Sequence, residues 1–116
     1  MKEENLIVLR KTEFLMDKVY RALVNFPKAE KYALCSEIKR AFYDLLRYIS
    51  LGNKVKSMRL RYLQTADGHL QLLKTLIRQA KRMKYIGVGF YKEIDMRLTE
   101  IDKLLSGYIR SSKKGG

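Results

Sequence analysis

The side chain best suited to chemistry in this sequence is His69, the only histidine of the 116-residue chain. Helical phosphotransfer domains use one exposed histidine as a phosphoryl acceptor, and they typically place a lysine and a glycine directly after it. Here the lysine is delayed to Lys74, and no glycine lies between the two residues. Another helical class cleaves RNA with an arginine placed closer to the histidine than Arg61 is. We therefore interpret His69 as a packing or interface residue and predict no enzymatic activity.

Carboxylates, glycines and one cysteine are the other groups that could do chemistry. The acids of residues 93–102 could pair for acid–base catalysis, but basic residues alternate with them, which indicates a surface charge lattice. Gly87 and Gly89 lack the third glycine and the preceding strand of a dinucleotide-binding fingerprint, so they indicate a turn. Cys35 is the single cysteine, so it forms no intrachain disulfide, and it is expected to be buried. We expect no cofactor and no metal.

Positive charge is the strongest signal in the sequence. Lys and Arg total 25 against 12 Asp and Glu, which gives a formal net charge of +13. Residues 53–84 contain nine of the cations and a single acid, Asp67, so one segment has a net charge of +8. Such a surplus repels itself unless a polyanion offsets it, which favours a nucleic-acid partner. The alternative is a solvated helix face, the common role of a charged run.

The candidate nucleic-acid contacts form two groups of basic residues, one in segment 27–52 and one in segment 53–84. They are Lys39, Arg40 and Arg47 in the first group, and Lys56, Lys74, Arg78, Lys81 and Arg82 in the second. Each phosphate contact would release counterions and steepen the salt dependence of binding by about one log unit. Tyr32 and Tyr43 lie among the first group and could stack on unpaired bases. Helical tyrosines are more often half-buried packing residues, so charge carries the prediction.

Four amphipathic helices are expected to position these residues, because apolar residues recur at three-residue and four-residue steps in four segments. We expect the helices at 6–25, 27–52 and 53–84, and a fourth helix after the turn of Gly87 and Gly89. Pro27 suits the first turn of a new helix, Gly52 can supply a stop, and Asn53 can cap the next helix. The predicted fold is an all-α, antiparallel up-down-up-down four-helix bundle.

The apolar stripes of these helices predict both the core and an interface. In the first helix the expected core residues are Phe14, Leu15, Val19, Ala22, Leu23 and Phe26. In the third they are Leu63, Ala66, Leu70, Leu73, Ile77 and Ala80. The third helix carries a second apolar set that includes Met58, Tyr62, Leu72 and Leu76. Together the two sets exceed the stripe of about 100° that one core requires, so we expect the second set to form an oligomer interface.

The length of the chain suits one compact domain. We expect this domain to span residues 1–112 and a flexible basic tail to span 113–116. The apolar run of residues 6–9 is far shorter than a membrane span, and acidic residues precede it where a secretory signal would be basic. We therefore expect a cytoplasmic protein with no membrane association.

Several sequence features between residues 14 and 110 occur in the order found in one protein family. They are Phe26-Pro27-Lys28 followed by Tyr32, the run Leu70-x-x-Leu73-Lys74-x-x-Ile77-Arg78, Tyr91, and the terminal Ile101-x-x-Leu104-Leu105-x-Gly107-Tyr108-Ile109-Arg110. In these features the chain resembles the accessory variability determinant (Avd) family of diversity-generating retroelements. That family is related to the four-helix proteins encoded in bacterial 23S ribosomal RNA intervening sequences. It often has glycine at the positions of Cys35 and Ser106 and tryptophan at Tyr108, so looser helix contacts are expected there.

The resemblance implies a homopentameric barrel of four-helix bundles. It further implies binding to the retroelement's reverse transcriptase and its template RNA, with DNA or an RNA/DNA hybrid as other ligands, in support of mutagenic cDNA synthesis. By position, Lys74 and Arg78 match paired basic residues that the family uses toward polymerase or nucleic acid. Lys74 stands where an arginine is expected, which weakens bidentate bonding. The alternatives are an RNA-binding intervening-sequence protein and, less favoured, a phosphotransfer or RNA-processing bundle.

Overall fold

The computed structural model describes residues 3–114, with side chains from residue 5 onward. Within this range the chain forms four α-helices and two 3-10 turns and contains no strand. The elements are α1 (Glu3–Leu23), η1 (Lys28–Glu30), α2 (Leu34–Lys54), η2 (Lys56–Met58), α3 (Arg59–Arg82) and α4 (Val88–Lys113). The predicted all-α class is confirmed.

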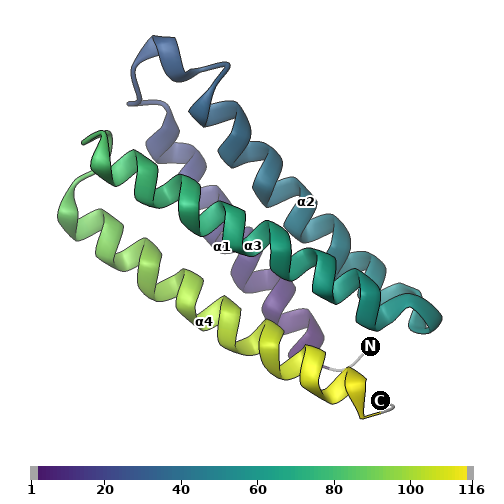
Figure 1. Ribbon diagram of the computed structural model, residues 1–116. Coiled ribbons are helices and arrows are strands. Elements are labelled where there is room, and N and C mark those ends of the chain that lie inside the picture. Colours follow the sequence, from purple (N-terminus) through teal and green to yellow (C-terminus); the bar gives the residue numbers. More distant parts are fainter. Residues whose placement is uncertain (1–2, 115–116) are drawn as a thin grey trace.

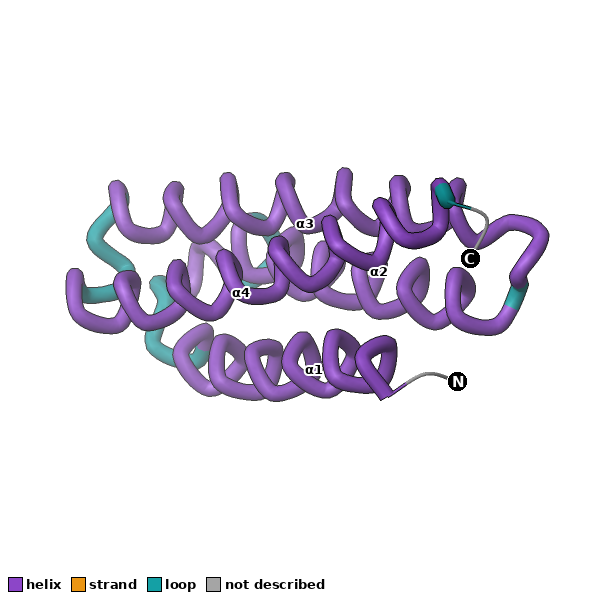
Figure 2. The backbone as a smooth tube through the Cα atoms, turned by 90° about the horizontal axis from the view of Figure 1, so that it is seen from below, coloured by secondary structure: helices purple, strands orange, loops and turns teal. Residues whose placement is uncertain are grey.

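Successive helices run in opposite directions, so the start of α1 and the end of α4 lie at the same end of the molecule (Figure 1). The bundle is elongated, with principal extents of 46 × 25 × 18 Å. Figure 2 shows α1 along one side of the bundle, with α4 beside it. The arrangement is the expected up-down-up-down bundle, whereas the pentameric barrel stays a prediction.

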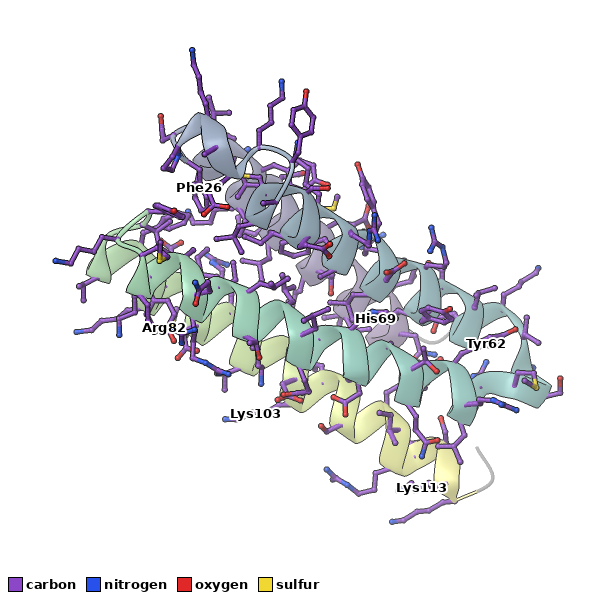
Figure 3. All side chains as sticks on the ribbon, turned by 45° about the horizontal axis from the view of Figure 1, so that its top comes forward. Phe26, Tyr62, His69, Arg82, Lys103 and Lys113 are labelled. Atoms are coloured by element: carbon purple, nitrogen blue, oxygen red, sulfur yellow. The ribbon has the colours of Figure 1, made fainter. Side chains whose placement is uncertain are left out.

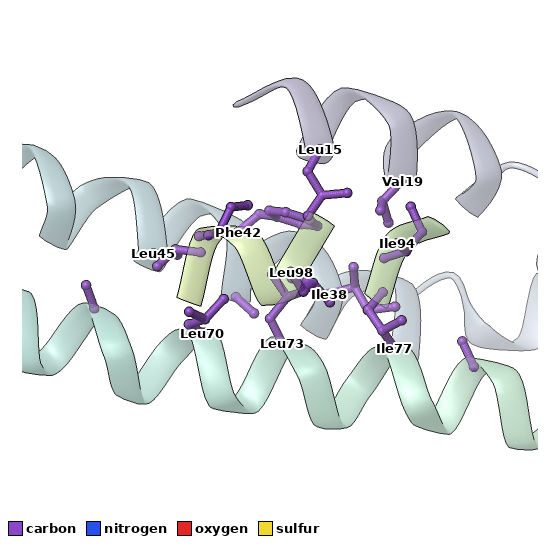
Figure 4. Packing of buried hydrophobic residues seen from close by; sticks show 14 of the residues in the cluster. Leu15, Val19, Ile38, Phe42, Leu45, Leu70, Leu73, Ile77, Ile94 and Leu98 are labelled. Atoms are coloured by element: carbon purple, nitrogen blue, oxygen red, sulfur yellow. The ribbon is translucent and has the colours of Figure 1, made fainter. Parts of the chain in front are cut away.

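Each helix contributes an apolar stripe to one continuous core (Figure 4). Leu15 of α1, Phe42 of α2, Leu73 of α3 and Leu98 of α4 are at most 1% exposed. All six core residues predicted for the third helix are buried. Burial of this apolar surface provides the main stabilisation of the bundle.

Phe14 was expected in the core but is 54% exposed. Its ring lies under the guanidinium of Arg97 on α4, whose central carbon is 4.9 Å from the ring centroid. The core side of α1 is extended instead by Val8 and by Thr12, which is fully buried. The Thr12 hydroxyl donates a hydrogen bond of 2.8 Å to the Val8 carbonyl, which makes its burial tolerable.

The expected helix start at Pro27 is wrong, because α2 begins only at Leu34. Pro27 precedes the 3-10 turn η1, and Phe26 before it is buried against Tyr85, with ring centroids 5.3 Å apart. The carboxylate of Glu30 accepts hydrogen bonds from the Leu34 amide at 3.3 Å and from the Tyr85 hydroxyl at 2.7 Å. This carboxylate therefore ties the delayed start of α2 to the loop that follows α3.

Gly52 and Asn53 were expected to end one helix and cap the next, but both lie within α2. A Cβ on Gly52 would come within 2.7 Å of Leu63 Cδ2, so glycine allows α2 and α3 to approach closely. Asn53 accepts a hydrogen bond of 2.6 Å from the Tyr108 hydroxyl of α4. Arg59, the first residue of α3, donates to the carbonyls of Gly52 at 2.8 Å and Asn53 at 3.1 Å. It thereby satisfies carbonyls that the end of α2 leaves without intrahelical partners.

The loop between α3 and α4 includes Lys84, whose positive φ of 63° reverses the chain after α3. Gly87 then precedes α4, and Gly89 lies inside this helix, which therefore begins earlier than expected. At the other end α4 continues through Lys113, so the first residue of the expected tail is helical. Gly115 and Gly116 lie outside the described residues.

Candidate nucleic-acid interface

A shallow hollow lies on the outer side of α2, with a volume of about 390 Å³. It is lined by Ser36, Arg40, Tyr43, Asp44 and Arg47, which we call the α2 face. These residues recur at three-residue and four-residue steps, so they form one stripe opposite the buried side of the helix. The core packing of α2 therefore holds the α2 face toward solvent.

The two arginines of the α2 face differ in their partners. Arg47 donates to Asp44 Oδ1 at 2.6 Å, and its side chain is 59% exposed. The side chain of Arg40 makes no hydrogen bond or ion pair with any residue in the range 5–114. Arg40 is thus a free cation next to a partly held one, and an anion can bind between them without breaking a strong internal contact.

Tyr43 is 53% exposed, and Tyr20 of α1 supports its ring. The two ring centroids are 6.2 Å apart and the planes meet at 84°, an edge-to-face contact. The Lys39 ammonium lies 5.3 Å from the Tyr20 ring centroid. The Tyr20 hydroxyl is buried and has no hydrogen-bond partner among the described residues, and burial raises the pKa of Tyr20 well above its ordinary value. Tyr20 is therefore a neutral, buried support for Tyr43.

A row of rings adjoins the α2 face where α2 meets α3. Tyr48 stacks on His69, with centroids 5.4 Å apart and planes 6° from parallel, and Tyr62 lies 6.1 Å from Tyr48. Figure 3 shows His69 and Tyr62 on the side of α3 that adjoins α2. His69 Nδ1 is also 3.8 Å from Asp44 Oδ2. His69 thus has the packing surroundings that the sequence indicated.

Two cations of α3 are held by α4. The ammonium of Lys74 pairs with the Asp102 carboxylate, and the two side chains are only 20% and 28% exposed. Lys81 places its ammonium 4.7 Å from the ring centroid of Tyr91. Both contacts join α3 to α4, and the ion pair of Lys74 reduces the charge available to a partner.

Two further α3 cations bond within their own helix and point outward. Arg78 donates to the Thr75 hydroxyl at 3.2 Å, and Arg82 donates to Gln79 Oε1 at 2.5 Å. Both arginines are exposed, and Figure 3 shows Arg82 projecting from the bundle. They remain accessible to a phosphate, but exposed tyrosine is not found beside them as it is beside Arg40.

Three carboxylates of α4, those of Glu93, Glu100 and Asp102, pair with cations, mainly from other helices. Glu93 Oε2 lies 2.9 Å from Lys18 Nζ of α1 and 3.3 Å from Arg97 Nε. The hydrogen bond from Lys18, opposed by partial burial and aided by Arg97, lowers the pKa of Glu93. Glu100 pairs with Lys11 of α1 at 3.2 Å. These contacts form a charge lattice, as expected, and most of them join two helices.

No group of three or more potential metal ligands occurs among the described residues. The thiol of Cys35 is buried, and this burial raises its pKa. Within the described part of the chain, no helix is both long and apolar enough to span a membrane.

The sequence of this bundle matches a family model for bAvd-like proteins over residues 6–112. The chain belongs to the bAvd-like family. The match covers all of α2 and α3. It also includes Glu93, Glu100 and Asp102, the α4 residues that form ion pairs.

The fold of this bAvd-like chain is also found in a solved structure. That structure is a protein of unknown function from the S23 ribosomal protein family of Bacteroides thetaiotaomicron, with a TM-score of 0.79 and 22% sequence identity. The match covers 92% of this chain and 98% of the other, so the likeness applies to the whole bundle. No curated protein matches the chain.

The predicted contact residues of the bAvd-like chain do not form one surface. Tyr32 is 86% exposed but lies beyond α2, with the Lys31 ammonium 5.4 Å from its ring centroid. Lys56 is exposed in η2, at the end of the bundle opposite to Tyr32. The structure brings Arg40, Tyr43 and Arg47 together on α2, and it places Lys74 inside an ion pair. The assignment of all these residues to polymerase or nucleic acid stays a prediction.

The predicted interface set of α3 is only partly accessible. Leu72 is 45% exposed, whereas Met58, Tyr62 and Leu76 are half-buried. Leu76 packs against the core of its own bundle. Part of the wide apolar face is therefore explained by packing within the chain. The oligomer interface stays a prediction.

Sequence reasoning missed the role of Tyr20 beneath Tyr43 and the role of Arg59 at the end of α2. Tyr20 directly follows the core residue Val19, and this position gives only a weak indication of its contact with α2. Arg59 was counted with the surplus charge of segment 53–84. The unusual sequence Gly52-Asn53 before it was the available sign that helix-end carbonyls needed a donor.

Proposed function

We propose that this bAvd-like protein is a non-catalytic accessory protein of a diversity-generating retroelement. It binds the reverse transcriptase and the template RNA, supports cDNA synthesis, and assembles as a homopentamer in the cytoplasm. The family match supports the accessory role. The observation that carries RNA binding is the α2 face, where the unpaired Arg40 lies beside the exposed ring of Tyr43 in a chain of net charge +13.

In this role the protein supplies a surface and no reacting group. Phosphates bind the exposed cations of α2 and α3, which releases counterions and makes the affinity dependent on salt. The large positive charge of each protomer would be offset by RNA, since assembly of several such chains otherwise concentrates like charge. RNA and the assembled protein thus stabilise each other.

The test is capture of a tagged copy from the native bacterium at moderate salt, with and without ribonuclease treatment. The proposal expects the retroelement's reverse transcriptase in both samples and template RNA in the untreated one. Sedimentation of the purified protein should give the mass of five chains of 13.7 kDa each. Loss of the reverse transcriptase after ribonuclease treatment would mean that RNA bridges the two proteins, and its absence from both samples would refute the accessory role.

The second candidate is an RNA-binding protein of the ribosomal intervening-sequence type. The observation that favours it is the fold shared with a protein of the S23 ribosomal protein family. The same capture separates the two, because this candidate predicts ribosomal RNA or ribosomal proteins and no reverse transcriptase.

A further inference from the structure

The ring of Tyr43 is presented as a fixed platform on the α2 face. Its contact with Tyr20 is nearly perpendicular, so this contact can cover at most one face of the ring. More than half of Tyr43 is exposed to solvent. Tyr20 packs against the core and its hydroxyl is buried, so the support beneath Tyr43 is anchored in the bundle. A flat ligand can therefore stack on Tyr43 without first ordering a mobile side chain.

Arg40 and Arg47 lie on either side of Tyr43 along the same stripe of α2. They are separated by two helical turns, a distance of about 10 Å along the axis. Arg40 has no partner within residues 5–114, and Arg47 shares its guanidinium with Asp44. An anion on each side of the ring would thus meet an exposed guanidinium, and the lining residue Ser36 adds a hydroxyl.

Other rings near cations differ from Tyr43 in their surroundings. Phe14 is equally exposed and lines a hollow with Arg10 and Arg97, but the Arg97 guanidinium already lies against its ring. Tyr91 is half-buried and is covered by the Lys81 ammonium. Tyr32 is the most exposed tyrosine of the described chain, but it precedes α2 and does not line the hollow. The basic side of α3 can therefore bind a phosphate backbone, whereas the α2 face can in addition bind the flat surface of a base.

We propose that the α2 face selects single-stranded over double-stranded RNA by stacking an unpaired base on Tyr43 while Arg40 and Arg47 bind the flanking phosphates. A base inside a duplex has both faces covered by its neighbours, so it cannot stack on a protein ring unless it leaves the helix. Stacking adds affinity only for the single strand, and the charge contacts add affinity for both forms. This inference rests on the proposed function, because it specifies the form of RNA that the same surface binds.

The test measures binding of the purified full chain to fluorescent RNA by anisotropy. One probe is a single-stranded uridine-rich RNA of about 12 nucleotides, a length within the usual range for such sites, and the other is a blunt RNA duplex of equal length. Tyr43→Ala should weaken binding of the single strand about tenfold and change binding of the duplex less than about twofold. Tyr43→Phe should retain binding of both probes, because its ring still stacks. Phe14→Ala, which removes an equally exposed ring on α1, is the matched control and should leave both affinities unchanged.

Equal losses on both probes, or no loss on the single strand, would overturn the proposal. A loss for Tyr43→Phe as large as for Tyr43→Ala would also overturn it, because the hydroxyl and not the ring would then be responsible. Unfolding curves of each variant separate loss of binding from loss of fold. If the reverse transcriptase is captured and wild-type protein binds RNA without strand preference, only this inference fails. If the wild type binds neither probe, RNA binding in the proposed function fails with it.

Discussion

Basic residues line both the α2 face and the outer side of α3, and their surroundings differ. On α2, Arg40 has no partner among residues 5–114 and lies beside an exposed tyrosine. On α3, Lys74 pairs with Asp102 and Lys81 lies over Tyr91. Some cations of the more basic segment of the sequence are thus used to pack α3 against α4. The charge available to a partner depends on the groups opposite each cation, which a count along the chain does not include.

The largest expected effect is on RNA binding by the α2 face. Arg40→Ala combined with Arg47→Ala removes two phosphate contacts, each worth about 0.7 log unit on a single strand at 0.1 M salt. The affinity for single-stranded RNA should fall roughly 25-fold, and the slope of log affinity against log salt should become shallower by about 1.4. Anisotropy titrations over a range of salt concentrations measure both quantities.

The matched control for this pair lies on α4. Lys103 and Arg110 are also exposed and two helical turns apart, so Lys103→Ala with Arg110→Ala makes the same change in net charge. This control should lower the affinity much less than the α2 pair does. Equal losses for the two double variants would mean that net charge alone drives binding and that the α2 face has no special role.

The next effect concerns the stability of the fold and tests the contrasting role of α3. Lys74→Ala removes the partner of Asp102, whose side chain is only 28% exposed. A carboxylate left unpaired in such surroundings should cost about 1–2 kcal/mol of unfolding free energy, equivalent to roughly 5 °C in melting temperature. Thermal unfolding followed by circular dichroism measures this change, and RNA affinity should fall far less than in the α2 pair.

Arg78 provides the control, because it is exposed one turn farther along α3 and bonds only to Thr75. Arg78→Ala should change stability by no more than about 0.5 kcal/mol. If Lys74→Ala instead leaves stability unchanged and abolishes binding of reverse transcriptase or RNA, then Lys74 is a partner contact, as its position in the family pattern implies.

The sequence gives the spacing of side chains along a helix, but it does not give the groups that pack against them. This difference explains which features of the fold could be predicted. The stripe that contains Leu70, Leu73 and Ile77 is buried as expected, because helical periodicity places these residues on one side of α3 whatever packs against them. Phe14 has the same apolar character, yet it lies outside the core beside Arg97. Its exposure depends on the position of α4, which local sequence does not encode.

Helix ends show the same limit. Gly52-Asn53 has the composition of a helix stop, but Leu63 fills the space that glycine leaves open and Tyr108 binds the asparagine. Both partners come from other helices, so propensity alone placed the boundary too early. For the candidate site, residue type identified Arg40 and Tyr43, whereas the support of Tyr43 by Tyr20 of α1 required the structure.

The smallest expected effect tests whether the ion pair of Lys18 on α1 stabilises the fold, as the ion pair of Lys74 is expected to do. Lys18 lowers the pKa of Glu93, so the folded state binds the carboxylate's proton more weakly than the unfolded state does. The stabilisation is therefore complete above the unfolded pKa of about 4.3, and it is lost as pH falls through the lower folded value. Glu93→Gln should be slightly less stable than wild type at about pH 7, and the difference should shrink at about pH 3.

Urea unfolding of both proteins at the two pH values measures this closing difference. Asp95→Asn is a suitable control, because Asp95 is exposed on the same helix and its carboxylate makes no ion pair among the described residues. Its difference from wild type should not follow the same pH course. If Glu93→Gln behaves like the Asp95 variant, the contact with Lys18 contributes no stability, and Lys18 would join Arg40 as a cation available to a partner.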